Sequence, residues 1–183
     1  MKEDTEEKGW LTQAMAGDRQ AFARLLEHSY DRIYRLAYRW CGVREDAEEI
    51  AQEVCIKLAR AISTLQHPEA FSSWLYGLVL NTARDFHRQQ QRQHGQQEYG
   101  LDLSCFASHE PNPEQSLQAR LIHRCIALLP DPLRMAVLLV HAQGLNHRQA
   151  GDTLCCAEGT ISWRLSQARK QLTACLNQGV PRG

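Results

Sequence analysis

The sequence predicts an all-α protein made of two small helical domains joined by a flexible acidic linker. Apolar residues recur at intervals of three and four along most of the chain, the pattern of helices with one buried face. Alternating apolar and polar runs bounded by turn residues, which would indicate strands, are missing. A stretch rich in Gln, Gly and Pro over residues 89–116 separates two periodic blocks. Because such a long structureless stretch is unusual inside one compact domain, two domains are expected.

Three long helices are predicted in the first block. Residues 19–41 carry one apolar stripe, and Gly42 is a suitable stop. Residues 44–62 repeat the same pattern. A third helix is expected over residues 68–90. Pro68 suits its first position, because an N–H group there has no partner within the helix and proline loses nothing by lacking one.

The second block predicts shorter helices, the first of them carrying the periodic residues Leu117, Leu121, Cys125, Leu128 and Leu129 and broken by Pro130. Pro132 suits the start of one helix, and Gly144 suits the left-handed position just past its end. Asn146 then caps a short helix, with Gln149 three residues further on as in a capping box. After a turn at Cys155–Ala157, the last helix is expected over residues 158–177.

The domain division also separates the charges. The predicted parts are a tail with a first helix (1–18), a first domain (19–93), a linker (94–116) and a second domain (117–178). The whole chain has 21 basic and 21 acidic residues, a balance that argues against a strong free binder of nucleic acid. However, residues 96–119 hold 4 acidic and no basic side chains, whereas residues 120–183 hold 8 basic and 3 acidic ones. The last third is therefore basic and the linker acidic.

The N-terminal residues and the apolar runs favour a cytoplasmic protein that does not insert into a membrane. The first eight residues are mostly charged and no apolar run follows them, unlike a signal peptide. The longest clean apolar run, Met135–Val140, is far too short to span a bilayer.

The seven cysteines are expected to be small buried hydrophobes. A disulfide framework is not expected for an odd number of cysteines in a reducing compartment. No C-x-x-C spacing occurs, and the neighbours Cys155 and Cys156 do not suit one tetrahedral metal ion. No metal and no cofactor are therefore predicted. Gly-rich phosphate loops and nucleophile elbows are also missing, so no catalytic residue is assigned.

The last two helices fit a helix-turn-helix, whose second helix would enter the major groove of duplex DNA. Outside its buried stripe this helix carries hydrogen-bonding and cationic side chains: Gly159, Thr160, Ser162, Trp163, Arg164, Gln167, Arg169 and Lys170. Such groups near the helix start can hold phosphates and reach bases. A plain helical hairpin with a solvated face is the alternative.

The first domain has two polar helix faces. The first face carries acidic and amide side chains: Glu45, Glu48, Glu49, Gln52 and Glu53. It could dock a basic partner. The alternative is that acidic residues in the first turn only stabilise the helix through its dipole. The second is the stripe of Asn81, Arg84, Arg88 and Arg92 on the 68–90 helix and its continuation. Amide and guanidinium groups beside aromatic residues suit single-stranded nucleic acid, and a solvated charged face is the alternative.

Several motifs resemble one protein family when taken in order. They are Asp18–Phe22, Arg44–Val54, Phe71–Leu78, Asn81 and Arg88 in the first half, and Leu128–Pro130, Arg134, Gly144-Leu145, Gly159–Ile161, Arg164-Leu165 and Ala168-Arg169 in the second. On these residues the chain resembles the extracytoplasmic-function (ECF, group four) sigma factors, dissociable specificity subunits of bacterial RNA polymerase. The match spans about residues 19–93 and 117–176.

The resemblance implies a role for each polar face. The first domain corresponds to sigma region 2 and the second to region 4. Binding to the clamp helices of the largest subunit of core RNA polymerase is implied for Asp46, Glu49, Gln52 and Glu53. Capture of the unwound −10 strand is implied for Gln66, His67, Asn81, Arg84, Asp85 and Arg88. Reading of the −35 duplex is implied for Glu158, Gly159, Thr160, Ser162, Trp163, Arg164, Gln167 and Arg169.

The family also implies partners. Besides promoter DNA and the clamp helices, region 4 would meet the flap of the second-largest polymerase subunit, and an anti-sigma factor would hold the protein inactive. The chain departs from the family pattern at Gly151, at Cys155 in the turn, and at Ser162, Trp163 and Gln167 in the recognition helix. Two other functions remain open at this stage: a stand-alone helix-turn-helix regulator, and a thiol- or metal-responsive sensor.

Overall fold

Every regular element in the computed structural model is a helix within the residues that it describes, 2–94 and 121–179. The predicted all-α class is therefore confirmed. The predicted linker lies outside the described residues, except for His94. Within the two described ranges, no helix combines the length and the apolar character that crossing a bilayer requires.

The described residues 2–94, which include the tail helix and the first domain, hold four α-helices. They are α1 (Lys2–Met15), α2 (Arg19–Cys41), α3 (Arg44–Ala61) and α4 (Phe71–His94), with 3₁₀ turns at Ile62–Thr64 and Pro68–Ala70. Asp18 caps α2, since its carboxylate accepts hydrogen bonds from the amides of Gln20 and Ala21 at 2.8 and 3.1 Å. Gly42 ends α2 with a left-handed φ of 72°. Pro68 opens a 3₁₀ turn rather than α4 itself, and α4 runs beyond the predicted end near residue 90.

The second domain follows the predicted order of elements. It contains a helix over residues 121–127, α6 (Asp131–Val137), a π-helical turn (Leu138–Ala142), α7 (His147–Thr153) and α8 (Glu158–Gly179). The capping box at α7 is present: Asn146 accepts from the Gln149 amide at 2.9 Å, and Gln149 accepts from the Asn146 amide at 3.0 Å. Gly144 has the predicted left-handed backbone, with φ of 72°.

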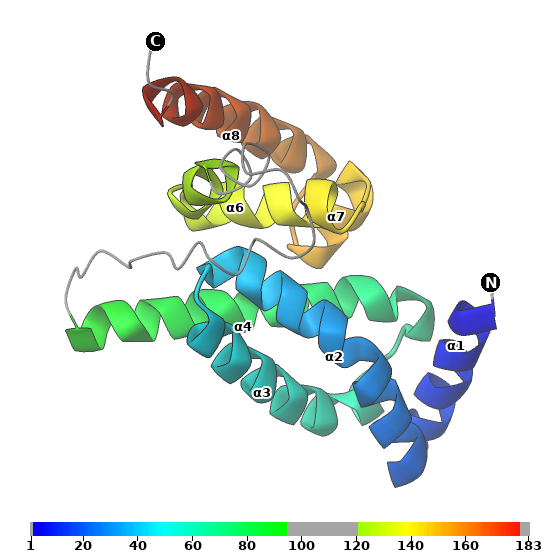
Figure 1. Cartoon of the computed structure of the whole chain (residues 1–183). Helices are drawn as coiled ribbons and strands as arrows, with labels where there is room; N and C mark the ends of the chain where they lie inside the picture. Colours follow the sequence, from blue (N-terminus) through cyan, green and yellow to red (C-terminus); the bar gives the residue numbers. More distant parts are fainter. Residues whose placement is uncertain (1, 95–120, 180–183) are drawn as a thin grey trace.

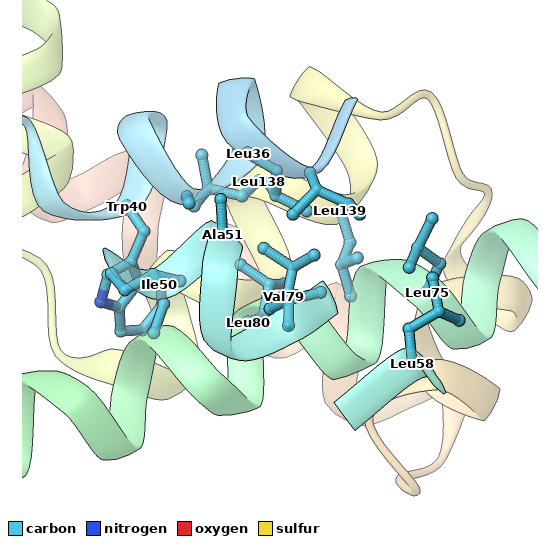
Figure 2. Packing of buried hydrophobic residues seen from close by; sticks show 14 of the residues in the cluster. Leu36, Trp40, Ile50, Ala51, Leu58, Leu75, Val79, Leu80, Leu138 and Leu139 are labelled. Atoms are coloured by element: carbon cyan, nitrogen blue, oxygen red, sulfur yellow. The ribbon is translucent and has the colours of Figure 1, made fainter. Parts of the chain in front are cut away.

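The two domains pack directly on each other. Figure 1 shows α6, α7 and α8 forming a layer over α2, α3 and α4. In Figure 2, Leu36, Ile50 and Leu80 of the first domain share one apolar cluster with Leu138 and Leu139 of the second. A smaller cluster beneath α8 is formed by Leu129, Leu133, Val137 and Ala168. The apolar side chains of α6 therefore pack on two sides: some contact the first domain, and the others contact α8.

Arg134 of α6 is the polar centre of this interface. Its side chain is buried, and its guanidinium lies 4.6 Å from the centre of the Trp40 ring of α2. It donates hydrogen bonds to the carbonyl oxygens of Ala127, of Leu129 (3.1 Å) and of Trp40 (3.3 Å). Arg134 therefore joins the first domain to the start of the second.

A disulfide joins Cys125 in the helix over residues 121–127 to Cys175 in α8. The expectation of free thiols is wrong for this pair. The two residues are 50 positions apart in the sequence, and packing of the helix against α8 brings their Cα atoms within 5.8 Å. Spacing along the chain carries no sign of that contact. Cys41, Cys55, Cys155 and Cys156 are free, and Cys105 lies outside the described residues.

Candidate nucleic-acid interface

The acidic face of the first domain lies on α3. Glu49, Gln52 and Glu53 are exposed, and Asp46 is half-buried one turn before Glu49. Gln52 also lines a hollow of about 290 Å³ with Tyr30, Tyr34, Arg44 and Glu48, from α2 and α3. The predicted group of Asp46, Glu49, Gln52 and Glu53 therefore forms a single acidic ridge, which we call the α3 ridge.

Negative charges crowd together on the α3 ridge. Burial raises the pKa of Asp46, and the nearby carboxylates of Glu49 and Glu45 raise it further. Within α3, Lys57 lies 3.6 Å from Glu53 of the ridge, and Arg44 lies 3.0 Å from the neighbouring Glu48. A cationic partner surface would lower the energy of the ionised ridge.

The predicted single-strand face lies on α4 and the loop before it. Asn81, Asp85 and Arg88 are exposed, and Arg84 is half-buried with its guanidinium 3.3 Å from Asp85. Gln66 and His67 are exposed in the loop, where His67 lies 3.1 Å from Glu69. Arg88 also reaches across the domain boundary, since its Nε is 3.8 Å from the Asp131 carboxylate of α6.

The turn between α7 and α8 depends on close backbone approach at Gly151. A Cβ atom at this position would lie 2.7 Å from the carbonyl oxygen of Cys156, which is closer than side chains tolerate. The Cys156 amide also donates to the Gly151 carbonyl at 2.9 Å. Cys155 takes the left-handed conformation with φ of 50°, where glycine would be less strained. Gly151 thus has a packing role that its helix propensity does not suggest.

Gly151→Ala is expected to lower the free energy of unfolding by about 1–3 kcal/mol, because the added methyl group forces the turn apart. Helix propensity alone predicts the opposite, a gain of up to about 1 kcal/mol. Chemical denaturation of the full chain measures the difference. Gly159→Ala is the matched control, since a Cβ there meets nothing within 4 Å. Equal stability of the two variants would contradict the close approach.

The predicted duplex-reading residues of α8 differ in exposure. Glu158, Gly159, Ser162, Trp163 and Arg169 are exposed, and Trp163 has 60% of its surface open to solvent. Three predicted residues turn partly inward: Thr160, Arg164 and Gln167. The Arg164 guanidinium points back to the turn, 3.7 Å from Cys156 Sγ. The exposed centre of the face is therefore Ser162 and Trp163.

Two models of the same protein family match the two domains. Sigma-70 region 2 matches residues 25–93, and Sigma-70 region 4 matches residues 119–172. The SigE ECF RNA polymerase sigma factor of Mycolicibacterium smegmatis is 34% identical over 152 residues, which are 81% of this chain and 58% of that protein. The ECF sigma-E factor of Escherichia coli is 26% identical over 182 residues, which are 94% of this chain and 95% of that protein. The chain belongs to the extracytoplasmic-function sigma factor family.

Solved structures show the same fold. CnrH, in complex with the cytosolic domain of CnrY, aligns over 96% of this chain and 99% of its own, with a TM-score of 0.70 and 18% identity. The sigma factor RpoE, in complex with the anti-sigma factor NepR from Bartonella quintana, aligns over 87% of this chain and 98% of its own, with a TM-score of 0.68 and 21% identity. The arrangement of helices in this sigma factor is thus shared by distant sequences.

Two side chains outside the predicted set lie at these faces of the sigma factor. His147, at the start of α7, is 2.9 Å from the hydroxyl of Ser162. Lys57 of α3 donates to the Thr82 hydroxyl of α4 at 3.2 Å, next to Asn81. Neither contact has a signal in the sequence, because each joins two helices. The i,i+4 spacing of Lys57 from Glu53 suggests only a surface ion pair.

Proposed function

We propose that this protein is a non-enzymatic promoter-specificity subunit, which binds core RNA polymerase in the cytoplasm, directs it to particular promoters and opens the −10 element. The observation that supports the proposal best is the presence of three separate polar surfaces on two sigma domains. They are the acidic α3 ridge, the amide and guanidinium face of α4, and the exposed face of α8. Each has the chemistry of a different partner.

The α3 ridge suits the clamp helices of the largest polymerase subunit. Asp46, Glu49 and Glu53 would face cationic side chains, and the ionised form of Asp46 would be favoured on contact. The flap of the second-largest subunit would contact the second domain. A basic surface docked on the α3 ridge would bind more tightly as the pH rises above the raised pKa of Asp46, because the carboxylate is then ionised.

The α4 face suits a single strand. Asn81 offers an amide to a base edge, and Arg84 and Arg88 offer guanidinium groups to the phosphates or to a base face. Gln66 and His67 extend this surface into the preceding loop. Flipping a base out of the duplex costs a few kcal/mol, which a pocket with cations alongside can offset. The α8 face would read the −35 element as duplex.

The closed packing of the two domains bears on regulation. The −35 and −10 positions are separated by about 85 Å of duplex, taking 3.4 Å per base pair. A compact chain of this length has a radius of gyration of only about 16 Å. In the closed form α4 and α7 touch where Gly77 meets Thr153, so the domains must separate before both elements are bound. An anti-sigma factor that holds this closed form would keep the protein inactive.

Run-off transcription with bacterial core polymerase and fragmented genomic DNA tests the function. New promoter-specific transcripts that need this protein are the expected result. Their absence over a broad template set would refute the proposal. Sequence-specific duplex binding by the free protein, with no polymerase-dependent transcript, would instead favour a stand-alone regulator.

Trp163 is expected to contact the C5-methyl group of a −35 thymine, because it is the large apolar side chain exposed on the described part of α8. Replacing that thymine by uracil should weaken holoenzyme binding about fourfold, the value of one methyl group. In the Trp163→Ala protein the same replacement should have no effect. Ser166→Ala, on the same exposed side of α8, is the control. A uracil effect that persists without Trp163 would contradict this contact.

A further inference from the structure

The disulfide joins the first and the last described helices of the second domain. Cys125 is buried, with 1% of its surface exposed, in the helix over residues 121–127. Cys175 is only partly buried, in the last turns of α8. The bond therefore ties the first described helix of this domain to the far end of the helix that carries the proposed −35 face (Figure 1).

The apolar packing that holds the second half of α8 is small. Beneath it lie Leu129, Leu133 and Val137, which meet Ala168, and the partly buried Leu172 is the last side chain that packs on this cluster. Cys175 lies beyond Leu172, so the disulfide extends the attachment of α8 toward its C-terminal end. The same short helix ends at Ala127, whose carbonyl accepts from Arg134. The bond thus braces α8 against the element that leads into the interdomain contact.

The other described cysteines do not share this arrangement. Cys41 and Cys55 are free and not bonded to another cysteine; burial raises the pKa of Cys41 to about 12 and also raises the pKa of Cys55. Cys155 and Cys156 are free neighbours in the turn. Within the described residues, Cys125 and Cys175 are therefore the pair placed for reversible oxidation.

We propose that Cys125 and Cys175 form a reversible thiol–disulfide switch, which braces α8 when oxidised and loosens its C-terminal half when reduced. The oxidant class is a low-molecular-weight disulfide of the oxidised-glutathione type. Disulfides in a reducing cytoplasm are commonly transient or redox-sensing rather than permanent, which favours a switch over a fixed cross-link. The choice of a switch over a fixed cross-link and the expected effect on −35 binding rest on the function proposed above, whereas the redox chemistry and the change in rigidity are tested independently of it.

Access decides the order of the chemical steps. Cys175, which is more accessible than Cys125, loses a proton to solvent, and its thiolate attacks one sulfur of the small disulfide, releasing one small thiolate and leaving a mixed disulfide. The buried Cys125 then loses its proton and attacks the Cys175 sulfur, which forms the protein disulfide and releases the second small thiolate. The protein loses two electrons and two protons, and the small disulfide gains the two electrons and becomes two thiols.

Redox titration of the full chain tests reversibility. The protein is equilibrated in buffers with varied ratios of reduced to oxidised glutathione, and its free thiols are alkylated and located by mass spectrometry. The expected result is a single reversible transition in which Cys125 and Cys175 lose alkylation together. A bond that persists in a large excess of reduced glutathione, or one that never forms with oxidised glutathione, would overturn the proposal.

Hydrogen exchange and thermal unfolding test the bracing of α8. Reduction of the wild-type protein should speed amide exchange in the last turns of α8 and lower the melting temperature of the second domain by roughly 10 °C. Cys175→Ser should behave like the reduced wild type in both oxidising and reducing buffer. Cys125→Ala, which removes the other half of the bond, should behave in the same way. Cys155→Ser should retain the full response. A Cys175→Ser protein that still responds to reduction would refute the assignment.

The effect on promoter binding is measured separately, with oxidised and reduced holoenzyme on duplex that carries the −35 element. Oxidation should strengthen binding by threefold or more, and Cys175→Ser should abolish the difference. A reversible disulfide that braces α8 without altering binding would overturn the functional half of the switch. No promoter-specific binding in either state would refute the proposed function and leave the switch itself established.

Discussion

Replacing Arg84 and Arg88 together by alanine is expected to reduce open-complex formation roughly 100-fold, while binding to core polymerase changes less than about twofold. A hydrogen bond to a charged group is worth about 1.5–3 kcal/mol, so the loss of two guanidinium contacts has a large effect on the melted state. Arg88 is exposed and Arg84 half-buried on α4. The α3 ridge, which is proposed to bind core polymerase, lies on another helix, so core binding should change little. Permanganate reactivity of unpaired thymines measures opening, and fluorescence titration measures core binding.

The matched control for this variant is Arg19→Ala with Arg24→Ala. It removes the same charge from exposed positions on α2. Opening should then stay near the wild-type level, apart from a small general loss due to reduced charge. If the α4 variant loses core binding and opening to the same extent, the assignment of α4 to the −10 strand is wrong.

Arg134→Ala is expected to lower the free energy of unfolding by about 3–5 kcal/mol. The side chain supplies donors to three carbonyl groups and a cation to the Trp40 ring, and unpaired buried acceptors cost about 1–3 kcal/mol each. Because the carbonyls belong to both domains, the closed packing should weaken as well. Urea unfolding measures the first effect, and small-angle X-ray scattering measures the increase in size.

Arg134→Lys separates charge from geometry, because lysine keeps the positive charge and loses the planar fork of donors. Its stability should fall between those of the wild type and Arg134→Ala. Arg124→Ala, which removes an exposed arginine from the neighbouring helix, should be neutral within about 0.5 kcal/mol. A loss below about 1 kcal/mol for Arg134→Ala would show that this arginine does not hold the interface.

Local sequence was sufficient for most helices because their signals are short-range. The Gly42 stop of α2 depends on neighbours within four residues, as does the capping box of α7. The end of α4 was predicted too early for the same reason. Its Gln-rich continuation carries no apolar stripe, yet Gln and Arg are good helix formers and extend the helix to His94.

The candidate site was only partly predictable. Residues on one helix, such as Asp46, Glu49 and Glu53 on α3, share a face because of helical periodicity, so their grouping follows from spacing. Arg164 shows where that reasoning stops: periodicity placed it outward, but the bend of the turn brings Cys156 within reach of its guanidinium. His147 and Ser162 meet only because α7 and α8 pack together.

The sequence by itself determined that this is an all-helical ECF sigma factor with an acidic ridge, a cationic helix and a helix-turn-helix. Those features are local patterns or motifs in a fixed order. Tertiary structure alone decided that the domains close on each other through Arg134 and Trp40, that Gly151 must lack a side chain, and that Cys125 and Cys175 are bonded. Each of these depends on atoms brought together from separate helices, and the geometry of such contacts is set by packing rather than by spacing along the chain.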